Sequence, residues 1–172
     1  ALNDLDLNGG EYFLVTVHRQ ENVDDKKRFC NILKGLEMVR KEFGVELIYP
    51  IHPRSRKRLE AFGLKPHGVR LIEPLDYLSF LQLESNARLV LTDSGGIQEE
   101  ACILGVPCVT LRDNTERPET LEVGSNILAG TDPIEIVKKV DFMLNKKRNW
   151  PNPFGDGKAS EQVVRILSEK IG

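Results

Sequence analysis

Six short runs of apolar and β-branched residues alternate with longer segments of helical periodicity along almost the whole chain. The runs cover residues 12–17, 45–51, 69–72, 89–92, 106–111 and 126–128. The helical segments cover residues 25–43, 55–62, 77–83, 97–104, 133–144 and 160–170. Strands that alternate with helices form parallel βαβ units, whose right-handed crossovers cover both faces of a sheet. The sequence therefore predicts an α/β fold with a doubly wound parallel sheet of about six strands.

The length of the chain, 172 residues, is that of a single domain. If the strands take the common order 3-2-1-4-5-6, the switch point lies between the first and fourth strands, and ligands bind outside the carboxyl ends of those two strands. The two most unusual polar clusters, residues 18–22 and 93–96, directly follow these strands. We therefore expect the binding site at this edge of the sheet.

The second cluster contains Ser94, Gly95 and Gly96 and leads into a helix. Such a turn exposes successive backbone N–H groups at the positive end of the helix dipole, and phosphate is their natural ligand. Two residues without side chains let an anion approach the backbone closely. The alternative is an ordinary strand-to-helix turn that Ser94 caps, and the local sequence does not decide between the two.

Glu99 and Glu100 fall in the first turn or so of the same predicted helix, where acidic residues are favourable even without a ligand. A carboxylate one turn from a phosphate site can also accept hydrogen bonds from a ribose diol, as the acidic residue of dinucleotide-binding folds does. Glu100 is therefore a candidate ribose ligand.

His18 follows a strand that should be buried, where its imidazole can donate to a diphosphate or move a proton near neutral pH. A histidine satisfied by neighbouring backbone is the simpler alternative, but Arg19 and Asn22 beside it favour a functional role. Arg117, in the polar and non-periodic segment 112–124, can neutralise phosphate charge, although a solvated charged loop explains such a run as well. The histidines show no metal-ligand spacing, so we expect no metal of the zinc type.

The charge balance argues against polyanionic partners. The chain has 24 Lys and Arg against 26 Asp and Glu, a formal net charge of −2, and so no broad basic field for nucleic acid or an anionic membrane. No apolar run approaches the length of a membrane span. The three cysteines cannot all pair, and Cys108 lies in an apolar run, where a free thiol behaves as a small hydrophobe. These features favour a cytoplasmic protein.

Five motifs together resemble one family, the non-hydrolysing UDP-N-acetylglucosamine 2-epimerases. They are residues 16–22 (TVHRQEN), 51–53 (IHP), 74–78 (PLDYL), 92–101 (TDSGGIQEEA) and 115–119 (TERPE). The similarity runs in one order from about residue 12 to residue 167. It implies a GT-B architecture, in which two Rossmann-like domains face each other across a cleft, with residues 1–172 as the C-terminal, UDP-binding domain.

The resemblance also implies a reaction. UDP-N-acetylglucosamine and UDP-N-acetylmannosamine would interconvert by anti elimination of UDP and its re-addition, without a cofactor, in a cytoplasmic homodimer. The carboxylates that move the C2 proton would belong to an N-terminal domain that this chain, which starts at Ala1, lacks. The chain alone is then expected to bind UDP and UDP-N-acetylglucosamine and to be inactive.

The resemblance assigns individual residues as well. Ser94, Gly95 and Gly96 would hold the diphosphate, with His18 and Arg117 beside it. Glu100 would bind the ribose and Phe80 would line the uracil. Arg19 and His52 match positions that contact a second, activating UDP-N-acetylglucosamine in some members. Leu75 stands where members often have Gln, which removes one polar contact near the nucleotide.

Two other functions fit the same residues. One is the nucleotide-sugar-binding domain of a GT-B glycosyltransferase, and the other is a UDP-binding module without chemistry. The last predicted helix carries an apolar face of Val163, Ile166 and Leu167. We expect this face to lack its native partner in the isolated domain, and so to fray, swap or pack between chains.

Overall fold

The six predicted strands form one parallel sheet in the order β3-β2-β1-β4-β5-β6, which confirms the predicted order. The computed structural model describes residue 2 and residues 5–171. The strands are β1 (Tyr12–Thr16), β2 (Glu46–Pro50), β3 (Val69–Ile72), β4 (Leu89–Thr92), β5 (Cys108–Thr110) and β6 (Asn126–Leu128). The switch point of the strand order therefore lies between β1 and β4, and the two polar clusters of the sequence directly follow these two strands.

Six of the described helices lie where periodicity predicts them, and two short ones do not. The predicted helices are α2 (Lys26–Phe43), α3 (Pro53–Phe62), α4 (Tyr77–Asn86), α5 (Gly95–Leu104), α7 (Pro133–Asn145) and α8 (Ala159–Ile171). The additional ones are α1 (Gln20–Val23) and α6 (Pro118–Glu122). The segment 112–124 is thus not wholly irregular, because Pro118 starts a helix there; a helix of five residues is too short to show periodicity.

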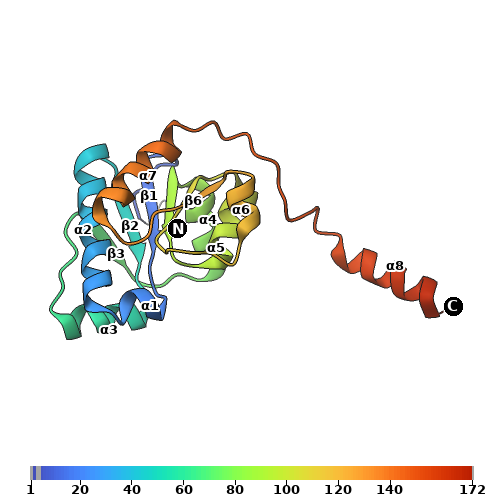
Figure 1. Ribbon diagram of the computed structural model, residues 1–172, viewed down its shortest axis with the longest axis horizontal. Helices are drawn as coiled ribbons and strands as arrows, with labels where there is room; N and C mark the ends of the chain where they lie inside the picture. The colour runs from blue at the N-terminus through green and yellow to red at the C-terminus, as the bar shows by residue number, and fades with distance from the viewer. Residues whose placement is uncertain (1, 3–4, 172) are drawn as a thin grey trace.

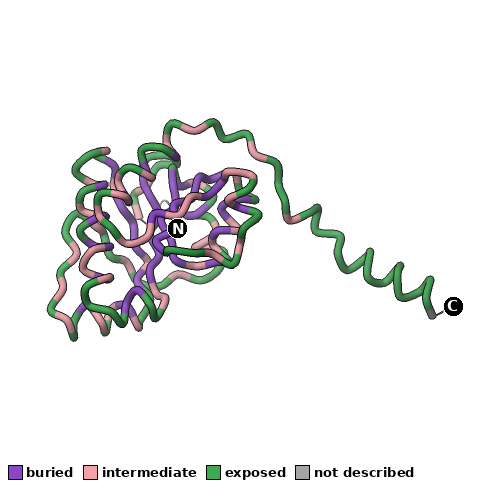
Figure 2. The backbone as a smooth tube through the Cα atoms, viewed as in Figure 1, coloured by how far each residue is buried: buried purple, intermediate pink, exposed green. Residues whose placement is uncertain are grey.

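The sheet lies between two layers of helices (Figure 1). Alternate residues of β1 pack into two different cores, one on each face of the sheet. Phe13, Val15 and Val17 pack into a core shared with α1, α2, α3 and α7. Tyr12 and Leu14 pack into a second core shared with α4 and α5. Figure 2 shows the buried residues concentrated along the strands. A parallel sheet that is apolar on both faces leaves its carboxyl edge as the place for polar groups.

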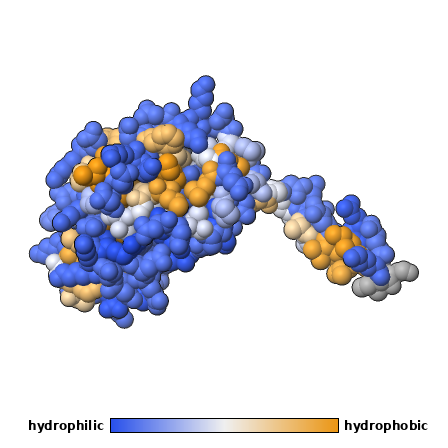
Figure 3. Space-filling model, viewed as in Figure 1, coloured by the Kyte–Doolittle hydropathy of each residue, from blue (hydrophilic) through white to orange (hydrophobic). Residues whose placement is uncertain are grey.

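Helix α8 projects from the body of the domain at the end of an extended segment (Figures 1 and 2). Val163, Val164, Ile166 and Leu167 are exposed on it and form the apolar patch seen in Figure 3. The expectation that this face is not covered by its own domain is confirmed, while its fraying or pairing with another chain stays a prediction. Among the residues described, no helix is both long and apolar enough to cross a membrane.

Candidate active site

The carboxyl ends of β1 and β4 lie side by side and bring the two polar clusters together. The hydroxyl groups of Thr16 and Thr92, the last residues of the two strands, are 2.6 Å apart and share a hydrogen bond. His18 and Arg19 leave β1 at this point, and Asp93 leaves β4. The predicted location of the site at the switch point agrees with this geometry.

Asp93 holds the loop that follows β1. Its fully buried carboxylate accepts the main-chain N–H groups of His18, at 3.1 Å, and of Arg19, at 2.9 Å. It also accepts the side-chain amide of Asn22 at 3.1 Å. A buried charge is tolerated where several donors surround it. The sequence places Asp93 in the second polar cluster. Its contact with the loop after β1 joins residues that are 75 positions apart in the chain, which the sequence does not show.

His18 is half-buried, and its Nδ1 lies 3.4 Å from Oδ1 of Asp93. Burial lowers the pKa of His18 below its ordinary value of 6.5; Asp93 opposes this shift, whereas His52 and Arg19 add to it. The rings of His18 and His52 stand 5.7 Å apart between centroids. At neutral pH the His18 imidazole is therefore mainly uncharged and kept close to Asp93.

The start of α5 is open. Ser94 occupies the N-cap position but its side chain accepts no capping hydrogen bond, and its own N–H donates to Oγ1 of Thr92 at 3.0 Å. The first helical bond at this end runs from Gln98 N–H to the Ser94 carbonyl. The alternative in which Ser94 caps the helix is thus wrong, and the backbone N–H groups of Gly95 and Gly96 have no partner within the helix. This arrangement favours an anion site.

Glu116 lies against this helix start. A Cβ atom placed on Gly95 would come within 2.7 Å of Oε1 of Glu116, whereas one placed on Gly96 would meet nothing within 4 Å. Glu116 forms ion pairs with Arg19 and, at 2.6 Å, with Arg112. The hydrogen bond from Arg112, chiefly, lowers the pKa of Glu116 to about 2. An ionised carboxylate therefore already lies next to Gly95.

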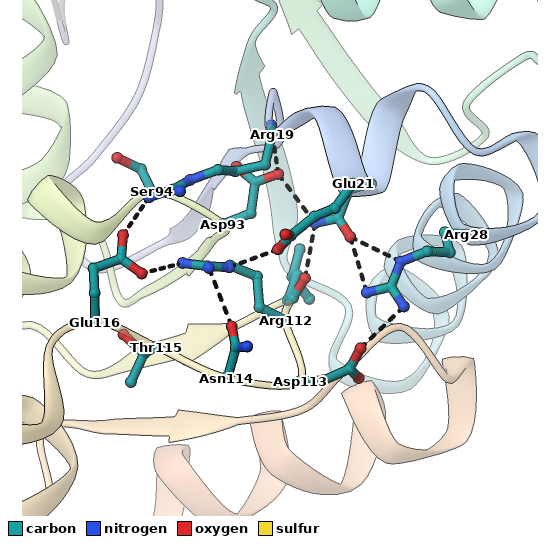
Figure 4. Close-up of polar contacts among 12 residues, drawn as sticks. Arg19, Glu21, Arg28, Asp93, Ser94, Arg112, Asp113, Asn114, Thr115 and Glu116 are labelled. Carbon is teal, nitrogen blue, oxygen red and sulfur yellow. Dashed lines mark hydrogen bonds and ion pairs between the residues drawn. The ribbon is translucent and has the colours of Figure 1, made fainter.

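Arg112 joins the loops that follow β1 and β5. Its buried guanidinium donates to Glu21 at 2.7 Å, to Glu116 at 2.6 Å and to Asn114 at 3.1 Å. Figure 4 shows this network from the side, with Arg28 bound to Asp113 at its edge. Sequence reasoning missed Arg112, Glu21 and Glu116 as individual contacts. The signal available in the sequence was Arg112, which directly follows a buried strand, because a buried arginine is rarely found without an acidic partner.

Glu99 and Glu100 lie in the second turn of α5, and no acidic residue lies in the first turn. The predicted first-turn position is therefore wrong by about one turn, because the helix starts two residues earlier than periodicity suggested. Nε of Arg117 is 2.6 Å from Oε1 of Glu99, so this arginine is paired on the outside of α5. The hydroxyl group of Tyr77, on α4, donates to Oε1 of Glu100 at 3.2 Å.

A pocket of about 160 Å³ opens beside His18 at the carboxyl ends of β1 and β2. Apolar side chains make most of its wall, and three of the predicted site residues, His18, His52 and Phe80, line it. The lining residues are Thr16, Val17, His18, Tyr49, Pro50, His52, Pro74, Leu75, Phe80 and Ile97. The structure thus brings His18, His52 and Phe80 together around one pocket. Glu100 lies outside this pocket on α5, and Arg117, at the start of α6, pairs with Glu99 of α5.

Within the described part of the chain, no three His, Cys, Asp or Glu side chains gather as metal ligands would. Cys30, Cys102 and Cys108 are free thiols.

Residues 2–168 match the family model described as UDP-N-acetylglucosamine 2-epimerase. The chain belongs to this epimerase family. Two curated relatives named UDP-N-acetylglucosamine 2-epimerase are 56% identical over 92% of this chain, in Methanocaldococcus jannaschii, and 52% identical over 91%, in Methanococcus maripaludis. Each match covers only 44% of the relative, so the chain spans slightly less than half the length of these epimerases.

A solved structure of the same epimerase family has a closely similar fold. It is the Methanocaldococcus jannaschii UDP-GlcNAc 2-epimerase in complex with UDP-GlcNAc and UDP, which is 56% identical with a TM-score of 0.86. The match covers 92% of this chain and 45% of that chain. The Rossmann-like sheet seen here is thus one found in epimerases of the GT-B type.

Proposed function

We propose that this chain is the UDP-binding domain of an enzyme that interconverts UDP-N-acetylglucosamine and UDP-N-acetylmannosamine. The observation that carries the proposal is the open start of α5 beside His18 at the switch point of the sheet. The match over residues 2–168 to the epimerase family supports the same reading.

The diphosphate of UDP is the group we assign to the start of α5. Ser94, Gly95 and Gly96 would donate backbone N–H groups to it, and the helix dipole would add to the attraction. His18 would donate from the side of β1, and Arg117 would turn from Glu99 to the phosphate. The Glu116 carboxylate beside Gly95 would have to move outward as the phosphate enters, because two anions repel at that distance.

The nucleoside would extend from this point toward α4. Phe80 lines an apolar pocket next to His18, which suits the flat face of uracil. Leu75 belongs to the same wall, so the base would meet an apolar side chain where many family members offer Gln. Glu100 would accept hydrogen bonds from the ribose hydroxyl groups, on the side where Tyr77 already contacts it.

The chemistry assigned to this half of the site is departure of UDP. The bond from C1 of the sugar to UDP breaks as the C2 proton is lost, which gives UDP and 2-acetamidoglucal. UDP then adds back to C1, and a proton adds to the opposite face of C2. Backbone N–H groups together with His18 and Arg117 would stabilise the negative charge that develops on the leaving UDP. The carboxylates that carry the C2 proton would come from an N-terminal domain, so this chain alone should be inactive.

Residues 1–172 would then be the C-terminal domain of a GT-B homodimer. Arg19 and His52 would serve a second, activating substrate molecule. In the ligand-free chain Arg19 pairs with Glu116, and Nδ1 of His52 accepts the N–H of Arg54 at 3.1 Å. Binding of an activator at Arg19 would therefore compete with the Glu116 ion pair.

Titration of UDP into isotope-labelled chain tests the proposal. Amide shifts clustered at His18, residues 94–96 and Arg117 would support it, and shifts scattered elsewhere would overturn it. Incubation with UDP-N-acetylglucosamine should give no manno epimer by NMR, and clear turnover would refute the inactivity of the chain alone. With an upstream domain supplied, sugar transfer to an acceptor would instead indicate a glycosyltransferase, and binding without epimerisation a non-catalytic module.

A further inference from the structure

Glu84 is a fully buried carboxyl on α4 that the proposed function does not use. Among the described residues, no donor hydrogen-bonds either of its carboxyl oxygens. An ionised carboxylate without partners is one of the most costly groups to bury, so such a residue needs a specific explanation.

Among the described residues, the charged group that acts on the pKa of Glu84 is negative. Tyr77 and Glu84 are seven residues apart on α4, about two helical turns, and so share the face that meets α5. Glu100 of α5 is the charged group that acts on Glu84 most strongly, and Cys108 of β5 also senses the Glu84 charge. Tyr12 of β1 donates its hydroxyl to the Leu83 carbonyl at 2.5 Å and is thereby occupied.

These surroundings keep a proton on Glu84. Burial, first, and then the charge and the hydrogen bond of Glu100 raise the pKa of Glu84 to about 9. Two carboxyl groups in contact form a hydrogen bond only when one of them is protonated, and the buried one holds the proton more firmly. At neutral pH Glu84 is therefore a neutral donor, and Glu100, which is partly exposed, is its acceptor.

We infer that Glu84 is a positioning residue, whose protonated carboxyl donates a hydrogen bond to Glu100 and holds that carboxylate ready for the ribose hydroxyl groups of a UDP-sugar. This inference rests on the ribose role of Glu100 in the proposed function. Together with the Tyr77 hydroxyl group, Glu84 gives Glu100 two donors from α4. A carboxylate fixed from one side loses less rotamer freedom when a ligand binds on the other side.

The protonation of Glu84 can be measured without any nucleotide. Carbon-13 NMR of chain labelled at the glutamate carboxyl groups follows each group through a pH titration, and Glu84→Gln identifies the Glu84 signal. We expect that signal to titrate far above the other glutamates. A titration in the ordinary glutamate range, at about pH 4 to 5, would overturn the inference.

The positioning role is tested by calorimetry with UDP and with 2′,3′-dideoxy-UDP. Glu84→Gln keeps a neutral donor and should bind both nucleotides as the wild type does. Glu84→Met fills the space without a donor and should weaken UDP binding about tenfold, the order expected for a lost hydrogen bond to a charged group. Its affinity for the dideoxy analogue should not change.

Equal losses for both nucleotides in Glu84→Met would indicate a purely structural role and overturn the inference. So would equal affinity of the wild type for the two nucleotides, because Glu100 would then not read the ribose. Failure of the proposed function as a whole has a different signature. The wild type would bind no UDP, while the carbon titration of Glu84 would still show a protonated group.

Discussion

The free energy of unfolding should depend on pH in a way that isolates the proton of Glu84. Burial and Glu100 raise the pKa of this group from an ordinary 4.5 to about 9 in the folded chain. Because the folded state binds this proton more tightly, the stability that the proton contributes is complete below the unfolded pKa. It is lost as the pH rises toward the folded pKa.

The size of the effect follows from linkage. Between the two pKa values the folded state holds one proton more than the unfolded state, which lowers the free energy of unfolding by about 1.4 kcal/mol per pH unit. From about pH 6 to about pH 8 the loss from Glu84 alone is about 3 kcal/mol. Glu84→Gln cannot ionise, so its stability relative to the wild type should rise by that amount over the same range.

Urea unfolding followed by circular dichroism at several pH values measures this difference. Histidines and other groups that titrate in the range contribute equally to both proteins and cancel in the comparison. Glu42→Gln, which changes an exposed glutamate of α2, is the matched control and should follow the wild type at every pH. Parallel stability curves for the wild type and Glu84→Gln would refute a proton held on Glu84.

Four other predictions concern the site edge and the C-terminal helix. Gly96→Ala should weaken UDP binding at least about tenfold in calorimetry without lowering stability, because its Cβ meets nothing within 4 Å. Unchanged UDP affinity in Gly96→Ala would contradict the diphosphate assignment. Gly95→Ala should lower the free energy of unfolding by about 1 kcal/mol, because the added Cβ meets the Glu116 side chain. UDP affinity should fall as the pH rises from about 5 to about 8, because a diphosphate favours the protonated His18 and burial lowers its pKa in the free chain. His18→Gln should lose only that part of the slope, since ionisation of the nucleotide is common to both proteins. Deletion of residues 158–172 should change the free energy of unfolding by less than about 0.5 kcal/mol, since every described side chain of α8 is exposed.

The elements and their order could be predicted because their causes are local or follow general rules of chirality. Apolar runs and helical periodicity located every described strand and six of the described helices. The start of α7 likewise has a local cause, because the Asp132 side chain accepts the N–H groups of Ile134 and Glu135 and Pro133 occupies the first helical position. Of the helices in the described residues, α1 and α6, with four and five residues, were not predicted, because one turn of helix repeats no pattern.

The meeting of the two polar clusters at the candidate site was predictable for a topological reason, and the side-chain contacts there were not. His18 and Asp93 are 75 positions apart, yet the ends of adjacent parallel strands must coincide, so their proximity follows from the strand order. The pairing of Arg112 with Glu21, across 91 positions, depends on how far each loop extends beyond its strand. The pairing of Arg117 with Glu99 depends on the rotation of α5 about its axis, which a sequence pattern fixes only to within a residue or two.

Two glutamates of this domain show why a formal net charge of −2 describes its chemistry so poorly. Glu116 lies between Arg19 and Arg112, and its pKa falls to about 2, so it remains a charge under all ordinary conditions. Glu84 is buried on α4 beside Glu100 of α5, and its burial, first, and then Glu100 raise its pKa to about 9, so it acts as a neutral donor. The difference arises from the surroundings of each residue, since the two side chains are chemically identical: burial comes first for Glu84, and the hydrogen bond from Arg112 comes first for Glu116. The guanidinium groups of Arg19 and Arg112 are thus already paired with the Glu116 carboxylate in the ligand-free chain. In the proposed diphosphate site, the backbone N–H groups of Gly95 and Gly96 would then be the chief donors to the anion.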